Sequence, residues 1–215
     1  MSSLVKAALF VMSPSEGEAV VAAQIEIEEW WHIYWENPGQ SGYPSELTGA
    51  CVREMVYAPP HMFTMPGEII NYGYEGSVWL FAKGDCKEGD SVTLSWLSCR
   101  EDTCVPGDFS APLQKIPSEL ERDVQEQWRS TLRTEAITHS GNGWSVAFKA
   151  PSAAEIEYFL TAGLETPSPE LSFTKTMFKK KWQISGSGAL SQGEKVVVRI
   201  TKRGKERVLL YTVQE

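Results

Sequence analysis

Cysteines are the residues of this chain whose type and spacing point most directly to chemistry. The 215-residue sequence contains four of them, Cys51, Cys86, Cys99 and Cys104. Their spacing does not match the paired short loops of a tetrahedral zinc site, so disulfide chemistry is the better interpretation. A chain of this length can build a hydrophobic core without two disulfides, which leaves one pair available for reaction.

The Cys99–Cys104 stretch closes a polar turn after a strand-like segment. If Arg100–Thr103 form a four-residue hairpin loop, the two cysteines flank it and face each other across the strands. Directly opposed Cβ atoms lie ~4.5–5.5 Å apart, whereas a relaxed disulfide prefers ~3.5–4.5 Å. We therefore expect a strained bond, whose raised reduction potential would suit repeated making and breaking.

A structural staple is the alternative interpretation of the same spacing. A bond that closes so short a loop removes little entropy from the unfolded chain. The neighbouring charges do not decide between the two, because Arg100 would lower the pKa of a thiol whereas Glu101 and Asp102 would raise it. For Cys51 and Cys86 three alternatives stay open: a second, structural disulfide, two free thiols, or a part in redox chemistry.

The segments around these cysteines have the pattern of a mainly β protein. Alternation of apolar and polar residues over Val21–Ile27 predicts a half-buried strand. Further strands are expected at Cys51–Tyr57, Ser77–Ala82 and Ser91–Ser98, each bounded by Gly, Pro or charged turn residues. Short strands at this spacing are typical of a β-sandwich.

An aromatic run, Trp30–Trp35, follows the first of these strands and ends at turn residues 37–42. We expect a bulge or an edge crossing near Trp30. The three tryptophans of the run, Trp30, Trp31 and Trp35, either pack in the core or between domains, or contact a partner protein, since aromatic residues are enriched in binding hot spots.

The pattern changes to helical between Pro117 and Thr134. Ser118 and Glu121 have the spacing of a capping box, and Leu120, Val124, Trp128 and Leu132 recur at helical intervals. We expect a redox domain at residues 1–113, a linking helix within residues 114–140 and a second, smaller β-sandwich domain at residues 141–215. Its strands are predicted at Trp144–Lys149, Ile156–Leu160, Leu171–Phe178, Lys181–Ser185, Lys195–Thr201 and Glu206–Val213.

The charge of the chain limits the class of partner. The formal net charge is -8, which argues against nucleic-acid binding, because that affinity depends on basic side chains that neutralise phosphates. The charge is also uneven, with 9 Lys/Arg and 21 Asp/Glu in residues 1–140 but 11 and 7 in residues 141–215. This asymmetry supports two domains, and we expect a protein or small molecule as the partner.

Metal binding and membrane insertion have little support in the sequence. The three histidines, His32, His61 and His139, show no ligand spacing, so we expect no metal and no cofactor. Copper(I) held by Cys99 and Cys104 with Met62 or Met65 is the weakest alternative. No apolar run approaches the ~20 residues of a membrane-spanning helix. Since Met1 leads directly into a strand-like segment, we expect a chain from which a targeting segment has been removed.

Three ordered motifs in the first ~110 residues carry a family resemblance. They are His32–Gly39 with Ser41–Gly42, then Asn71–Gly76, then Trp96–Cys99 with Cys104–Gly107. Together they resemble the N-terminal periplasmic domain of the thiol:disulfide interchange protein DsbD and its ScsB-like relatives. The linking helix and second domain resemble the longer ectodomains of those relatives.

The resemblance implies a protein-disulfide reductase domain with an immunoglobulin-like β-sandwich fold, which lies in the periplasm as part of an inner-membrane protein. Its cysteine pair, which maps onto Cys99 and Cys104, would accept electrons from the membrane-embedded domain of the same protein. It would pass them to periplasmic thioredoxin-like proteins through mixed disulfides, with Cys104 as the sulfur that joins the partner. A part in cytochrome c biogenesis is also implied.

In the family, a cap loop with aromatic residues covers the disulfide until a partner displaces it. The matching loop here is Asn71, Tyr72, Gly73 and Tyr74, with Tyr72 or Tyr74 as the lid. The main rival to the redox hypothesis is a non-catalytic immunoglobulin-like binding module, in which both cysteine pairs only stabilise loops.

Overall fold

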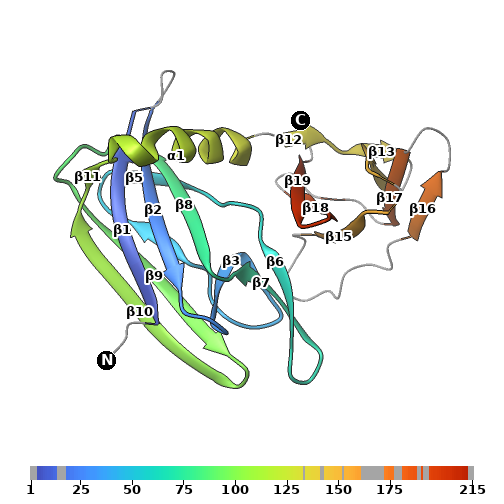
Figure 1. The fold of residues 1–215 in the computed structure, drawn as a ribbon, viewed down its shortest axis with the longest axis horizontal. Helices are drawn as coiled ribbons and strands as arrows, with labels where there is room; N and C mark the ends of the chain where they lie inside the picture. Colours follow the sequence, from blue (N-terminus) through green and yellow to red (C-terminus); the bar gives the residue numbers. More distant parts are fainter. Residues whose placement is uncertain are drawn as a thin grey trace. The chain divides into compact units, whose positions relative to one another are not determined.

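The computed structural model describes residues 4–13, 18–132, 134–140, 143–151, 153–160, 172–176, 181–187, 190 and 194–212. The chain divides into two compact units, Met1–Leu132 and Arg133–Glu215 (Figure 1). Strands make up most of the described residues, which confirms the mainly β fold class.

The first unit is built on two sheets. Sheet A has the strand order β11-β1-β2-β8-β5. Its strands are β1 (Val5–Met12), β2 (Ala19–Ile27), β5 (Val52–Val56), β8 (Ser77–Gly84) and β11 (Gln114–Lys115). Sheet B has the order β10-β9-β3-β7-β6, and β4 also pairs with β9. Its strands are β3 (His32–Gly39), β4 (Glu46–Thr48), β6 (His61–Met65), β7 (Ile69–Tyr74), β9 (Ser91–Arg100) and β10 (Thr103–Pro112).

Helix α1 (Ser118–Thr131) covers one face of sheet A, where Figure 1 shows it across β1, β2 and β8. Val124 and Trp128 join an apolar cluster with Phe81 and other sheet A residues, and the rings of Phe81 and Trp128 lie 5.3 Å apart. Because this face is covered, Val20–Ala23 of β2 are all buried. The predicted alternation is therefore seen only further along β2, where Glu26 is exposed.

The helix begins one residue earlier than the predicted capping box requires. Pro117 occupies the N-cap position, and the helix makes no side-chain cap hydrogen bond. Ser118 is already helical, and its hydroxyl lies 3.4 Å from Glu119 Oε2. The capping-box prediction is wrong because the rigid proline, rather than the serine, ends the preceding extended segment.

The segment 114–140, expected as a linking helix, contains more than a helix. It holds β11, which pairs with β1, then α1, then the short strands β12 (Thr134–Ala136) and β13 (Thr138–Ser140). The helix packs on sheet A through its apolar side, so it belongs to the first unit.

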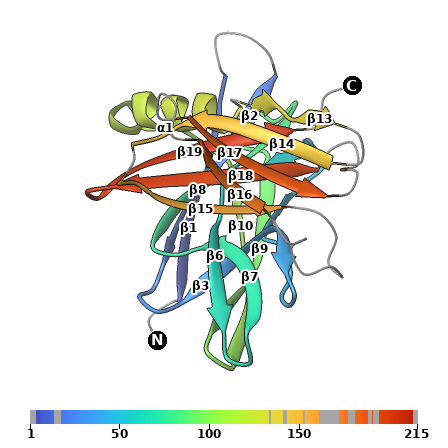
Figure 2. The ribbon, with the colours of Figure 1, turned by 90° about the vertical axis from the view of Figure 1, so that its right-hand side faces the viewer.

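The second unit contains two four-stranded sheets, with orders β12-β19-β18-β15 and β13-β14-β17-β16. Figure 2 shows its strands in yellow to red. Their bounds are β14 (Gly143–Lys149), β15 (Glu155–Leu160), β16 (Ser172–Thr176), β17 (Lys181–Ser187), β18 (Lys195–Lys202) and β19 (Lys205–Thr212). Buried residues of both sheets, including Trp144, Ile184 and Val198, form one core cluster, as expected for a β-sandwich.

Every strand predicted in the second unit overlaps an observed one, although Leu171, Met177, Phe178 and Val213 lie outside the described residues. Near Trp30, where a bulge or an edge crossing is expected, the chain passes from β2 of sheet A to β3 of sheet B through a tight turn, closed by a hydrogen bond from Trp31 N–H to Glu28 O at 3.0 Å. Trp30 sits in this turn with a φ of 71°. Among the described residues, no helix has the length and apolar character needed to cross a membrane.

Candidate functional site

The hairpin of β9 and β10 sets the geometry of the Cys99–Cys104 pair. Its register places Cys104 directly opposite Cys99 and Thr103 opposite Arg100. The loop is therefore two residues long, not four, because Arg100 and Thr103 continue the ladder and Glu101 makes the turn with a φ of 53°. The extra pairing holds the two cysteines one residue pair away from the end of the hairpin.

All four cysteines are bonded in two disulfides. Cys99 is joined to Cys104, with Cα atoms 4.1 Å apart, and Cys51 is joined to Cys86, with Cα atoms 4.8 Å apart. The second bond links the turn before β5 to the loop after β8, two strands that are themselves paired. Of the alternatives left open for Cys51 and Cys86, the structure therefore has the disulfide.

The two cysteines of the hairpin differ in their access to solvent. Cys99 is fully buried, at 0% exposure, whereas Cys104 is exposed. This difference follows from the sheet order, because β10 is an edge strand and β9 lies between β10 and β3. An attacking thiolate from solvent or from a partner can therefore approach Cys104 but not Cys99.

A row of three residues crosses sheet B at this point. His32 of β3 pairs with Cys99, which pairs with Cys104. The next row contains Tyr74, Ile33, Ser98 and Val105. Because successive residues of a strand point to opposite faces, His32, Cys99 and Cys104 share one face and the Tyr74 row faces the other way.

His32 is enclosed by aromatic rings on this face. Its imidazole stacks on Phe63 of β6 at a centroid distance of 4.9 Å and meets Tyr34 edge-on at 5.2 Å. The side chain is only 4% exposed, and its Nε2 has no hydrogen-bond partner. Burial lowers the pKa of the imidazole below 6.5, because desolvation disfavours the charged form.

An open groove of about 620 Å³ lies beside this row. It is lined by Trp30, His32, residues 62–65 of β6, Glu75, Arg100 and Glu101. The Arg100 guanidinium also lies over the ring of Trp31, 5.2 Å from its centroid. The groove thus brings aromatic, thioether and charged side chains together next to the hairpin that carries the disulfide.

The predicted cap residues Asn71–Tyr74 form part of β7, and the structure does not place their tyrosines beside the disulfide. Tyr72 and Tyr74 are two residues apart, so both project to the face opposite Cys99 and Cys104. Both are buried, at 6% and 2% exposure, and the Tyr74 hydroxyl donates to Ala58 O at 2.6 Å. A lid role for these tyrosines stays a prediction.

Asn71 and Gly73 lie on the disulfide's face, but each has a local packing role. The Asn71 amide donates to Tyr34 Oη at 3.4 Å and to Ser41 Oγ at 3.0 Å, and its oxygen accepts from Ser41 N–H at 3.2 Å. A Cβ at Gly73 would collide with the Ile33 carbonyl oxygen, so only glycine fits there. These motif residues thus tie β7 to β3 and to the loop after it.

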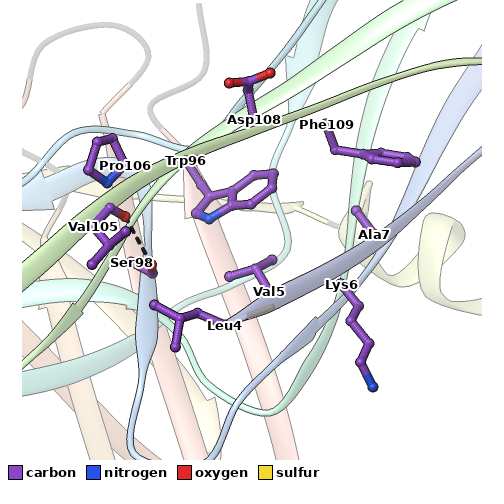
Figure 3. A pocket seen from close by; sticks show the side chains of 11 residues that line it. Leu4, Val5, Lys6, Ala7, Trp96, Ser98, Val105, Pro106, Asp108 and Phe109 are labelled. Carbon is purple, nitrogen blue, oxygen red and sulfur yellow. Dashed lines mark hydrogen bonds between the residues drawn. The ribbon is translucent and has the colours of Figure 1, made fainter. Parts of the chain in front are cut away.

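A second groove, of about 470 Å³, lies on the other side of the hairpin between β1 and β9–β10 (Figure 3). Leu4, Val5, Trp96 and Phe109 are among the side chains that line it, and Ser98 Oγ donates to Val105 O at 2.9 Å. A Cβ at Gly107 would come within 2.7 Å of the Trp96 indole, so this glycine makes room for the ring. The Trp96 and Gly107 motif residues therefore shape the strand pair that carries the cysteines.

The tryptophans of the aromatic run differ in role. Trp35 and Trp31 are buried, at 1% and 7% exposure, whereas Trp30 is 76% exposed at the edge of the groove. Within the described residues, no group of three or more His, Cys, Asp or Glu could hold a metal ion. Met62 and Met65 line the groove, but the sulfurs of Cys99 and Cys104 are bonded to each other.

Two residues of the site, His32 and Phe63, were not predicted to act there. His32 was considered only as a metal ligand, and Phe63 belongs to a segment, His61–Met65, for which no strand was expected. The pairing of β3 with β9 brings His32 to Cys99 across 67 positions of sequence. The sequence offers one indication that His32 belongs to the site, which is its position at the start of the first motif.

Solved structures resemble this chain in fold. A solved structure, the N-terminal periplasmic domain of ScsB from Proteus mirabilis, is 16% identical and has a TM-score of 0.61 over 98% of this chain and 93% of that chain. This likeness shows a shared fold over both units. A marsupial T cell receptor and the tandem Ig repeats of Dlar align with TM-scores of only 0.24 and 0.22, each at 11% identity and covering at least 97% of both chains.

No curated protein matches this chain. A model of the family described as thiol:disulfide interchange protein DsbD, N-terminal, matches residues 2–111. This match covers more than half of the 215 residues and includes Cys51, Cys86, Cys99 and Cys104. Together with the sandwich fold and the cysteine hairpin, it shows that the chain belongs to the family of DsbD N-terminal domains.

Proposed function

We propose that the first unit exchanges electrons with partner proteins through the Cys99–Cys104 pair, as a protein-disulfide reductase module. The observation that supports this most strongly is the asymmetry of the pair, with Cys104 exposed on an edge strand and Cys99 fully buried behind it. An exposed sulfur can join a partner, while a sulfur beside it, protected from solvent, can release that partner again.

Reduction of a partner takes two steps in which electrons and protons balance. The Cys104 thiolate attacks one sulfur of the partner's disulfide, forms a mixed disulfide and releases the other partner sulfur, which takes up a proton. Cys99, as a thiolate, then attacks Cys104 Sγ, closes the Cys99–Cys104 bond and releases the second partner sulfur. Two electrons have then passed from the cysteine pair to the partner, and the two protons that the cysteines lost on ionisation are balanced by the two that the released partner thiolates take up.

Family membership supports a proposal for the donor and the acceptors. We infer that the membrane-embedded domain of a DsbD-type protein reduces the pair and that periplasmic thioredoxin-like proteins are reduced by it. On this proposal the chain acts in the periplasm, and a part in cytochrome c biogenesis remains a prediction of the same kind. The exposed Trp30 and the groove beside Arg100 offer a contact surface next to the reactive sulfur.

An aromatic shield for the disulfide is better supplied by Phe63 than by Tyr72 or Tyr74. Phe63 pairs with Asn71, and its ring stacks on His32, so it lies on the face of Cys99 and Cys104. It is also only partly buried and belongs to the hairpin of β6 and β7, whose turn is at residues 66–68.

The experiment that tests the function is a titration of the intact chain in glutathione buffers of increasing reducing strength. Thiols would be trapped and located by mass spectrometry while folding is followed by circular dichroism. We expect Cys99 and Cys104 to be reduced at ~ -270 to -180 mV, the range of exchange proteins, with the fold and the Cys51–Cys86 bond intact. A potential below about -300 mV would make the pair a structural staple and favour a non-catalytic binding module.

A further inference from the structure

We propose that His32 is the general base that takes the proton from the Cys99 thiol when Cys99 closes the disulfide onto Cys104. The inference rests on the proposed function and assigns one proton transfer within it to a further residue. It concerns the second step of the exchange, in which the buried cysteine releases the partner.

This step needs a base because the nucleophile is a thiolate and Cys99 is fully buried. At 0% exposure the sulfur has no access to solvent hydroxide, and burial raises the pKa of a thiol. The adjacent cation does not compensate. Arg100 follows Cys99 on β9, so it points to the opposite face, and its guanidinium lies over Trp31.

His32 has the position that such a base requires. It pairs with Cys99 in the ladder and lies on the same face, where directly opposed Cβ atoms are ~4.5–5.5 Å apart. Its Nε2 is buried and has no hydrogen-bond partner in the disulfide-bonded state. A disulfide sulfur carries no proton to donate, whereas the reduced Cys99 has an S–H that can donate a hydrogen bond to His32 Nε2.

The imidazole is also in the right protonation state. Burial favours its neutral form, which is the form that accepts a proton. Packing alone does not account for a histidine here, because a phenylalanine ring would make the same contacts with Phe63 and Tyr34 without burying an unpaired nitrogen.

The other titratable and charged groups near His32 come from each neighbouring element. Tyr34 lies beside it on β3, and His61 reaches Phe63 from β6 with a ring distance of 6.4 Å. Glu75 follows β7, and Arg100 and Glu101 come from the hairpin that carries the cysteines; these three line the groove with His32. Of these groups, only Tyr34 makes direct ring contact with the imidazole in the described part of the chain.

The proton and the electron pair both have a defined path. The S–H bond of Cys99 breaks, the proton moves to His32 Nε2, and the sulfur electron pair forms the bond to Cys104 Sγ. The bond between Cys104 and the partner sulfur breaks, and that sulfur leaves as a thiolate. His32 then gives up its proton to the leaving thiolate or to water, and the imidazole returns to its neutral form.

The test follows this step directly, with a chromogenic aromatic disulfide as the partner. Reduced protein should release coloured thiol in two phases, first when Cys104 attacks and then when Cys99 resolves the mixed disulfide. His32→Phe and His32→Gln both remove the base, one keeping an aromatic ring and the other a polar group. His61→Gln is the matched control, since it changes another imidazole on the same face.

We expect the His32 variants to keep the first phase and to slow the second about tenfold at neutral pH. This is less than the ~10²-fold or more usual for general acid–base catalysis, because a thiolate is already a good leaving group. The pH profile should change as well. In the wild type the second phase falls only as the pH drops through the pKa of His32, which burial holds below 6.5, whereas in the variants it rises with pH up to the pKa of the thiol.

The outcomes separate the two hypotheses. If the wild-type pair is not reduced with the fold intact, or releases no second equivalent, the proposed function fails. If the wild type shows both phases and the folded His32 variants keep its second-phase rate and pH profile, only the role of His32 is overturned. An equal loss in His61→Gln would also overturn it, because the effect would not be specific to the row that contains Cys99.

Discussion

The two disulfides of the first unit differ in the chain they enclose and in their surroundings. Cys51–Cys86 joins positions 35 residues apart at the end of two paired strands, and Cys86 is buried. Cys99–Cys104 joins positions 5 residues apart on one hairpin, with one sulfur-bearing residue exposed and the other buried beside His32.

Chain entropy favours a structural role for the longer connection. In the loop-closure model, a bond across about 35 residues stabilises the folded state by about 4 kcal/mol, whereas one across about 5 residues contributes about 2 kcal/mol. The comparison teaches that Cys99–Cys104, the disulfide that stabilises the folded state less, is the one with a residue exposed to a partner. The following predictions test that division of roles.

The largest expected effect is on exchange activity. Cys104→Ser should abolish disulfide exchange, because it removes the exposed sulfur that joins the partner. Cys99→Ser should instead accumulate a stable mixed disulfide at Cys104, which non-reducing electrophoresis and mass spectrometry would detect. The control is the Cys51→Ser and Cys86→Ser double variant, and loss of exchange in this variant while it remains folded would contradict the division of roles.

The next effect is on stability. Replacing Cys51 and Cys86 with serine should lower the free energy of unfolding of the first unit by about 4 kcal/mol, against about 2 kcal/mol for the Cys99 and Cys104 pair. Denaturant titrations of oxidised wild type and both double variants would measure the difference. The reverse order would show that the hairpin bond is the main stabilising one.

A smaller effect is expected from Phe63, which we propose as the shield of the hairpin pair. Phe63→Ala should make reduction of Cys99–Cys104 by a small dithiol roughly 3- to 10-fold faster, because access to the bond increases. Met62→Ala is the control, since this side chain also lines the groove but belongs to the neighbouring ladder pair, Met62 with Tyr72, and not to the pair of Phe63 with Asn71. If only Tyr72→Phe or Tyr74→Phe changed the rate, the shield would belong to β7, as the motif alone predicts.

The smallest effect concerns Trp30, whose φ of 71° is unfavourable for any residue with a side chain. Trp30→Gly should raise the free energy of unfolding by about 1 kcal/mol, since the strain is relieved and an indole with 76% exposure loses little packing. Exchange with a protein partner should slow, while exchange with a small disulfide stays unchanged. Arg203→Gly, at a φ of 51° in the second unit, is the control that changes stability only.

Much of the local structure could be predicted from the sequence. Period-two alternation and turn residues located β2, β5, β8 and β9, and all the strands expected in residues 141–215 overlap observed ones. The opposed placement of Cys99 and Cys104 also followed from a local feature, because two residues on either side of a short polar turn face each other in any hairpin.

What local pattern could not decide was which distant elements lie together. The sequence by itself determined that a cysteine pair would close a hairpin in a mainly β chain with motifs of the DsbD N-terminal family. Only the tertiary structure decided that β3 lies beside β9, so that His32 meets Cys99, and that Tyr72 and Tyr74 face away while Phe63 stacks on His32. The physical reason is that strand order and register are set by packing across the whole sheet, and a shift of one residue exchanges its two faces.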